Sequence, residues 1–167
     1  MKPFIGIIGF ANSGKSSIIA SLTGNGNGSY VGKILNQKTK EYVFIYASSP
    51  QEIKKIGAVV YAEMKEHFQT LAADKKCRGV ICAIQPTKST KKPSMEKVFE
   101  LAKINNFELF GYVIDPPYNE GGRRISCGEI KNRLQNFEVE PERIDGRKFG
   151  LENAQIIQKE TKIILQQ

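Results

Sequence analysis

The residues best suited to chemistry lie near the start of the chain, between Gly9 and Ser17. Their sequence, GFANSGKSS, fits the pattern G-x-x-x-x-G-K-[ST] at every fixed position. Glycines let a backbone wrap closely around phosphate, and successive N–H groups of such a loop form an anion-binding nest. Lys15 would supply a cation to the β- and γ-phosphates, and the Ser16 hydroxyl would bind Mg²⁺. The segment therefore predicts a phosphate-binding loop for a nucleoside triphosphate.

The elements on either side of this loop are those that the motif requires. Lys2–Ile8 is a short apolar run typical of a strand covered on both faces. Ser16–Thr23 predicts a helix whose positive N-terminal end faces the loop. The residues that we expect to contact the phosphates are Gly9, Ala11, Asn12, Ser13, Gly14, Lys15, Ser16 and Ser17.

The rest of the chain alternates between strand and helix patterns. Two β-rich runs around a short polar link, Tyr30–Asn36 and Glu41–Ala47, predict a hairpin. The later segments with helical or buried-strand patterns are Pro50–Ala73, Arg78–Ile84, Pro93–Asn105, Phe107–Ile114, Ser126–Phe137 and Gly150–Leu165. This alternation predicts an α/β fold of three layers, the P-loop NTPase fold, with a mostly parallel sheet and one antiparallel edge strand. We expect residues 1–167 to form a single nucleotide-binding domain.

The composition limits the class of protein. Hydrophobic residues make up 40% of the 167 residues and charged residues 25%, which is typical of a globular domain. No apolar run approaches the roughly 20 residues of a membrane span. Three cysteines without a C-x-x-C pair argue against disulfides and zinc, so we expect a cytoplasmic protein. The net charge of +8 favours nucleotides, RNA or an acidic protein as partners.

The segment Ile5–Gly24, IGIIGFANSGKSSIIASLTG, resembles the start of the translation-factor-related GTPases. It is most similar to their ferrous-iron-transporter and Era/Obg-like branches, whose loop commonly reads G-x-P-N-x-G-K-[ST]. Ala11 replaces the proline here, and Asn12 is kept. The resemblance implies a GTPase-like order of elements over nearly the whole chain. It also makes Asn12 a candidate for holding a monovalent cation.

The chain departs from the other motifs of these GTPases. Where the family has D-x-x-G, with a carboxylate that holds Mg²⁺ through water, this chain has Ser48-Ser49-Pro50-Gln51. Where the family has N-K-x-D for guanine, this chain has Asp115-Pro116-Pro117-Tyr118. Ile144–Lys148 is only loosely similar to S-A-K, and Ser29 is the best hydroxyl for the first switch. Guanine specificity and efficient hydrolysis therefore do not follow from the resemblance.

Asp115 has two interpretations. It follows a strongly apolar strand, so it could bind Mg²⁺ through water if that strand lies next to the first one. The GTPase-like order instead favours the base-binding edge of the sheet, where Asp115, Pro116 and Tyr118 would lie on the side of the base.

Two other activities are compatible with short motifs. Gly121-Gly122-Arg123-Arg124 could close over phosphates as the lid of a small-molecule kinase. Asp115-Pro116-Pro117-Tyr118 also resembles the D-P-P-Y signature of amino-methyltransferases, which act on a flipped base. Lys88–Lys97 is a basic stretch that could touch nucleic acid or the nucleotide, or form a solvated loop before a helix.

The sequence as a whole predicts a nucleotide-binding P-loop protein that acts as a switch or regulator. We expect slow, Mg²⁺-dependent hydrolysis of GTP or ATP. Lys15 is the candidate for stabilising the transferred charge, and Gln51 is the nearest candidate for positioning water.

Overall fold

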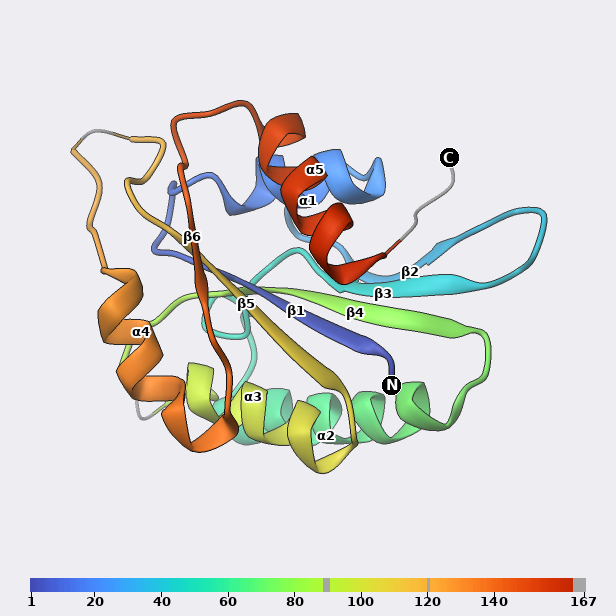
Figure 1. Ribbon diagram of the computed structural model, residues 1–167. Helices are drawn as coiled ribbons and strands as arrows, with labels where there is room; N and C mark the ends of the chain where they lie inside the picture. Colours follow the sequence, from blue (N-terminus) through green and yellow to red (C-terminus); the bar gives the residue numbers. More distant parts are fainter. Residues whose placement is uncertain (89–90, 120, 164–167) are drawn as a thin grey trace.

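The computed structural model describes residues 1–88, 91–119 and 121–163, which form one central sheet covered by helices on both faces (Figure 1). The elements in chain order are β1 (Pro3–Ile8), α1 (Lys15–Thr23), β2 (Val31–Leu35), β3 (Tyr42–Tyr46), α2 (Gly57–Ala73), β4 (Cys77–Ile84), α3 (Met95–Ile104), β5 (Glu108–Ile114), α4 (Cys127–Leu134), the 3₁₀ turn Gln135–Phe137, β6 (Glu142–Ile144) and α5 (Gly150–Thr161). This alternation confirms the predicted three-layer α/β fold.

The sheet has the strand order β2-β3-β4-β1-β5-β6. Only the β2–β3 pair is antiparallel, so the predicted hairpin forms the antiparallel edge. β1 lies at the centre, and its last residue, Ile8, is in register with Ile84 of β4 and Val113 of β5. Because parallel strands end at the same edge, the segments after β1, β4 and β5 meet there.

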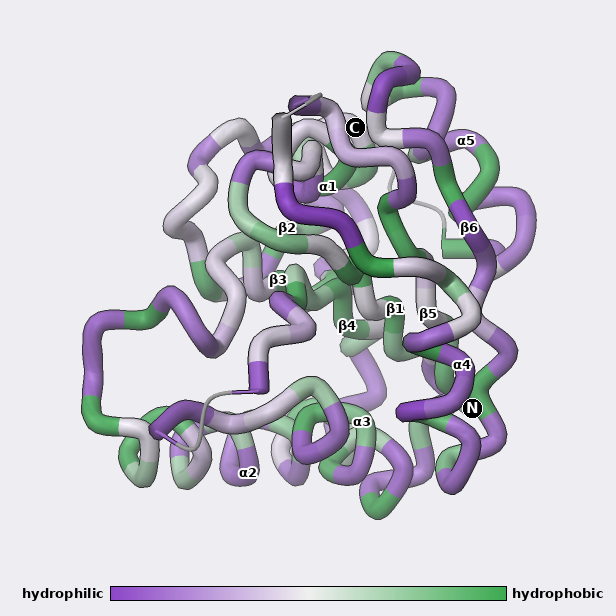
Figure 2. The backbone as a smooth tube through the Cα atoms, turned by 90° about the vertical axis from the view of Figure 1, so that its left-hand side faces the viewer, coloured by the Kyte–Doolittle hydropathy of each residue, from purple (hydrophilic) through white to green (hydrophobic). Residues whose placement is uncertain are grey.

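Two hydrophobic layers hold the helices to the sheet. One joins α2, α3 and α4 to one face, around large side chains such as Phe4, Phe68 and Phe99. The other joins α1 and α5 to the opposite face, around Ile5, Ile7 and other aliphatic side chains. Figure 2 shows largely hydrophobic strands in the middle of the molecule and helices of mixed hydrophilic and hydrophobic residues around them. Among the described residues, no helix is long and apolar enough to span a membrane.

The helix expected over Pro50–Ala73 begins only at Gly57, so the first part of that prediction is wrong. A distant segment contacts these residues, since the Lys92 ammonium donates hydrogen bonds to the carbonyls of Ile53 and Lys55. The Ile53 carbonyl also accepts from the Lys55 N–H at 2.9 Å, which is the hydrogen bond of a tight turn and not of an α-helix. The residues before Gly57 form turns instead.

Smaller differences occur at other boundaries. β6 was not predicted, because three residues with two charged side chains give no strand pattern. The predicted start of α4 is confirmed, since the Ser126 hydroxyl accepts a hydrogen bond from the Glu129 N–H at 3.1 Å. The last helix ends at Thr161, and the expected positions Ile164 and Leu165 lie outside the described residues, as do residues 89–90 of the basic stretch.

The position of β5 bears on the two interpretations of Asp115. β5 pairs directly with β1, which is the condition under which Asp115 could bind Mg²⁺ through water. β4 is inserted between β1 and β3, which moves the segment after β3 one strand farther from the phosphate-binding loop. The segment after β5 takes a place beside that loop.

Candidate functional site

The phosphate-binding loop is closed around the ammonium group of Lys15. Lys15 begins α1 and is only 7% exposed. Its Nζ donates to the carbonyl oxygens of Gly9 and Phe10, each at 2.8 Å. The lysine therefore lies against the inside of the loop, at the position from which it would reach the β- and γ-phosphates.

Close packing explains the glycine at the first position of the loop. A Cβ on Gly9 would lie 2.4 Å from the Ser13 hydroxyl oxygen, so no larger residue fits there without a shift. Gly14 is the N-cap of α1 in the left-handed conformation, with φ of 110°, and provides no side-chain cap. The first N–H groups of α1 are therefore available to an anion.

Burial changes the acidity of Lys15. It lowers the pKa of the ammonium from 10.5 to about 8, and the nearby Glu52 carboxylate partly opposes this shift. A bound polyphosphate would raise the pKa of Lys15 again, so binding of the ligand would favour the charged form of this lysine.

The segment after β5 is hydrogen-bonded to the phosphate-binding loop. The backbone N–H of Tyr118 donates to the Ser13 carbonyl at 2.9 Å. Gly146, after β6, donates its N–H to the Pro116 carbonyl at 2.9 Å, and a Cβ there would lie 2.8 Å from the Ser13 carbonyl. Three loops, after β1, β5 and β6, are therefore in mutual contact at one end of the sheet (Figure 1).

A cavity of about 820 Å³ opens between these three loops. Its lining combines loop residues with the candidates for the base side, namely Asn12, Gly14, Ser16, Ser17, Tyr118, Asn119 and Arg147. Tyr118 is 69% exposed, so its ring is free to stack on a flat ligand. The predicted phosphate-binding hydroxyls and one predicted base-side residue thus line the same cavity.

The Asp115 carboxylate is ion-paired with Arg124. Its Oδ1 accepts hydrogen bonds from Nε and Nη2 of Arg124, at 3.1 Å and 2.8 Å. The neighbouring Arg123 places its guanidinium over the ring of Phe10, 4.3 Å from the ring centre. The basic loop that includes residues 121–124 therefore already lies against the phosphate-binding loop.

The sequence makes Gln51 the nearest candidate for positioning water, whereas the structure favours its neighbour Glu52. The Gln51 side-chain amide donates to the Pro93 carbonyl at 2.7 Å and accepts from the Gln85 N–H at 3.2 Å, so it connects two segments of backbone. Glu52 is the carboxylate whose charge acts on Lys15, and it accepts a hydrogen bond from the Gln85 side chain. No motif marks Glu52, because its interaction with Lys15 joins two segments that are far apart in the sequence.

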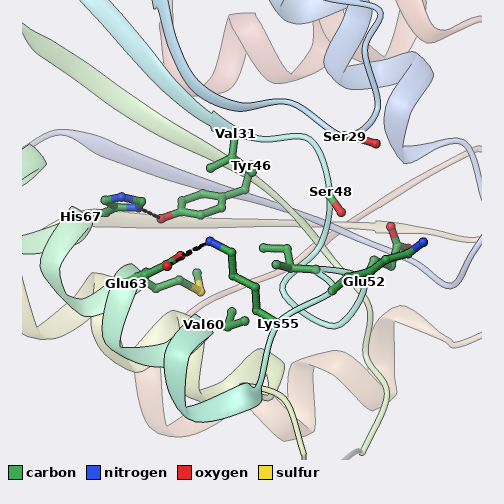
Figure 3. Close-up of a pocket in the computed structure, with 12 residues that line it drawn as sticks. Ser29, Val31, Tyr46, Ser48, Glu52, Lys55, Val60, Glu63 and His67 are labelled. Carbon is green, nitrogen blue, oxygen red and sulfur yellow. Dashed lines mark hydrogen bonds and ion pairs between the residues drawn. The ribbon is translucent and has the colours of Figure 1, made fainter.

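A second cavity, of about 830 Å³, extends away from Glu52 between β3 and α2 (Figure 3). Ser29, Ser48 and Glu52 lie toward one end of it, and His67 lies at the other, where its Nδ1 is 2.6 Å from the Tyr46 hydroxyl. Ser29 before the hairpin and Ser48 after it therefore line one cavity with Glu52.

The site suits a metal ion that is held mainly by the nucleotide. Among residues 1–88, 91–119 and 121–163, no three carboxylate, histidine or cysteine side chains gather as a metal site. Mg²⁺ in phosphate-binding loops takes a protein hydroxyl, phosphate oxygens and water. The exposed Ser16 in the first turn of α1 fits this role, with Glu52 as the nearby carboxylate, whereas Asp115 is occupied by Arg124.

Comparison with a family model agrees with the phosphate-binding loop. No curated protein matches this sequence. The G-domain of FeoB from Methanococcus jannaschii is a similar solved structure, with 16% identity and a TM-score of 0.49 over 98% of this chain and 100% of that one. The family model described as 50S ribosome-binding GTPase matches residues 4–109, which run from β1 into β5. With the phosphate-binding loop in place and most of its length matched, the chain belongs to the 50S ribosome-binding GTPase family.

Proposed function

We propose that this chain is a Mg²⁺-dependent GTP-binding switch with slow intrinsic hydrolysis. The observation that carries the proposal is the buried Lys15 ammonium, held by the carbonyls of Gly9 and Phe10 at the N-terminus of α1. This arrangement supports binding of the β- and γ-phosphates through Lys15 and the loop N–H groups. Ser16 would hold the metal together with the phosphates, and the metal would neutralise phosphate charge.

Slow turnover follows from the environment of the candidate water-positioning groups. Both ends of the Gln51 amide are hydrogen-bonded to backbone, so this side chain is not free to orient water. Glu52 is the better candidate, because its carboxylate already acts on Lys15. Hydrolysis would then depend on in-line attack by water, with charge stabilised by Lys15.

Weak selection of the base is the second part of the proposal. Asp115 is paired with Arg124, so the carboxylate contact expected for guanine is not available in this state. Tyr118 and Arg147 offer instead a ring and a planar cation beside the phosphate hydroxyls, which support stacking on any purine. We therefore expect GTP and ATP affinities to lie within about 100-fold of each other, because stacking tolerates all bases.

The remaining parts of the proposal rest on composition and family. We propose that residues 1–167 act as one nucleotide-binding domain. The net charge of +8 is compatible with an RNA or acidic protein partner, and the family description makes the ribosome the first partner to test, by co-sedimentation with and without GTP. A monovalent cation at Asn12 and a cytoplasmic location stay predictions. The kinase and methyltransferase interpretations receive no support from the family match.

Titration with GTP, GDP and ATP in the presence of Mg²⁺ tests the proposal. We expect micromolar or tighter GTP binding, and a loss of at least about 100-fold in Lys15→Ala, because a charge-assisted contact to phosphate disappears. Lys38→Ala, in the turn at the opposite end of the sheet, is the matched control and should bind as the wild type does. Failure of the wild type to bind any triphosphate, or equal binding by Lys15→Ala, would refute the proposal.

A further inference from the structure

We propose that Arg123 is a catalytic residue that supplies the arginine for hydrolysis from within the same chain. This inference rests on the proposed nucleotide site and adds a residue to it. Such arginines stabilise charge that develops on the transferred phosphoryl group, and they can come from the same chain or from a partner.

The position of Arg123 follows from the order of the strands. β5 pairs with β1, so the segment after β5 emerges beside the phosphate-binding loop. Tyr118 is hydrogen-bonded to Ser13 of that loop, and Arg124 is ion-paired with Asp115 at 2.8 Å. Arg123 precedes Arg124 and has its guanidinium over the ring of Phe10 in the loop.

Phe10 connects Arg123 with the end of the site where the γ-phosphate would lie. The Arg123 guanidinium is 4.3 Å from the centre of the Phe10 ring. The carbonyl of the same Phe10 accepts a hydrogen bond from the Lys15 ammonium, which serves the β- and γ-phosphates. Arg123 and Lys15 therefore approach one loop residue, through its ring and its carbonyl respectively.

The other arginine near the loop lies in a different place. Arg147 lines the cavity with Tyr118, Asn119 and Ser17. It is also ion-paired with Asp145 at 3.0 Å. The two arginines therefore lie on different parts of the loop, Arg147 at the cavity and Arg123 over Phe10.

The chemistry requires no further component. The oxygen of a water molecule forms a bond to the γ-phosphorus while the bond from that phosphorus to the bridging oxygen breaks. The electron pair of the broken bond stays on the β-phosphate of the diphosphate product, and the proton of water passes to the released phosphate. Arg123 would hold the negative charge of the equatorial oxygens, and a planar guanidinium can contact two oxygens at once. Phe10 is then a positioning residue, since it presents the guanidinium through its ring face.

The experiment compares four variants with the wild type. Arg123→Ala should leave GDP affinity within twofold, lower the preference for GTP over GDP, and slow single-turnover hydrolysis by about 100- to 1,000-fold, as loss of one charge-stabilising donor does. Arg123→Lys should recover only part of the rate. Phe10→Leu keeps an apolar side chain and should slow hydrolysis with unchanged GDP affinity. Arg78→Ala, in an exposed ion pair at the other end of β4, is the matched control.

Each outcome separates this inference from the proposed function. Wild-type turnover and unchanged GTP preference in Arg123→Ala would overturn the role of Arg123 while leaving GTP binding intact. Equal loss of GDP and GTP affinity would overturn it as well, because it would indicate a general effect of charge or folding. Failure of the wild type to bind nucleotide would count against the proposed function itself. Thermal melting of each variant checks that the fold is kept.

Discussion

The backbone N–H of Tyr118 lies 2.9 Å from the carbonyl oxygen of Ser13 and donates a hydrogen bond to it, which joins the segment after β5 to the phosphate-binding loop. Gly146 extends this connection to the segment after β6, through its own hydrogen bond to Pro116. The three loops therefore form one unit, and we expect a change in any of them to alter the affinity for the nucleotide phosphates.

The first prediction concerns Gly146→Ala. An added Cβ would lie 2.7 Å from the Pro116 carbonyl and 2.8 Å from the Ser13 carbonyl, so the two loops must separate. We expect a loss of about 1–3 kcal/mol in the free energy of unfolding, as for other overpacked sites, and weaker GTP binding. Denaturant unfolding and nucleotide titration measure both. Gly26→Ala, which would meet nothing within 4 Å, is the control, and equal stability of the two variants would contradict the prediction.

The second prediction is that nucleotide affinity falls above pH 8. The pKa of the buried Lys15 is lowered to about 8, and only the charged ammonium attracts phosphate. Above that pH, binding must include protonation of Lys15, so affinity should fall by up to tenfold per pH unit. Lys15→Arg stays charged over this range and should show a flat profile, whatever its absolute affinity. A wild-type profile that is flat from pH 7 to 10 would contradict the assigned role.

Through the same lysine, a rise in pH should increase the free energy of unfolding while it lowers the nucleotide affinity. Its pKa in the folded protein lies below the ordinary value of 10.5, so the folded state holds this proton less firmly than the unfolded state does. The contribution of Lys15 to stability therefore rises as the pH increases from about 8 to 10.5. Loss of nucleotide affinity in that range would thus reflect the charge of Lys15 and not unfolding.

Much of this site could be predicted from the sequence, because β1, the loop and α1 are consecutive and their pattern is local. What the sequence could not reveal depends on contacts between distant segments. Glu52 acts on Lys15 from beyond the β2–β3 hairpin. Lys92 binds the carbonyls that precede α2 from a segment beyond β4. Strand order in a parallel sheet is set by packing of whole elements, so no short motif encodes it.

The third prediction distinguishes an ion-pair role of Asp115 from a metal role. Arg124 is 60% exposed, so the Asp115–Arg124 pair should contribute only about 0.2–1 kcal/mol of coupling in a double-mutant cycle. Asp115→Asn should then leave the Mg²⁺ concentration needed for GTP binding unchanged. An increase of tenfold or more in that concentration would instead assign Asp115 to the metal, as its place after a strand beside β1 allows.

The fourth prediction tests the stacking role of Tyr118. Its exposed ring lines the cavity next to Ser17, and stacking on a base is worth about 1–3 kcal/mol. Tyr118→Ala should weaken GTP and ATP by similar factors, whereas Tyr118→Phe should keep both affinities. A selective loss of GTP alone would show that the hydroxyl or the backbone of this segment reads guanine.

The last prediction concerns two glutamates that join β6 to α5. Glu142 shares a hydrogen bond with Glu160, which raises the pKa of Glu142 from 4.5 to about 7, and the Tyr112 hydroxyl donates to Glu160 at 2.5 Å. The folded state therefore holds a proton that the unfolded state releases near pH 4.5. The stabilisation from this pair is fully present below that pH and is lost as the pH rises through 7. Because both side chains are exposed, the effect should be modest.

Urea unfolding between pH 5 and 8 measures this effect. The free energy of unfolding should decline with pH in the wild type, decline less in Glu142→Gln, and decline as in the wild type in Glu152→Gln, an exposed glutamate of α5. An unchanged decline in Glu142→Gln would mean that the two carboxyl groups do not share a proton, and the hydrogen bond of Glu160 would then be the one from Tyr112 of β5.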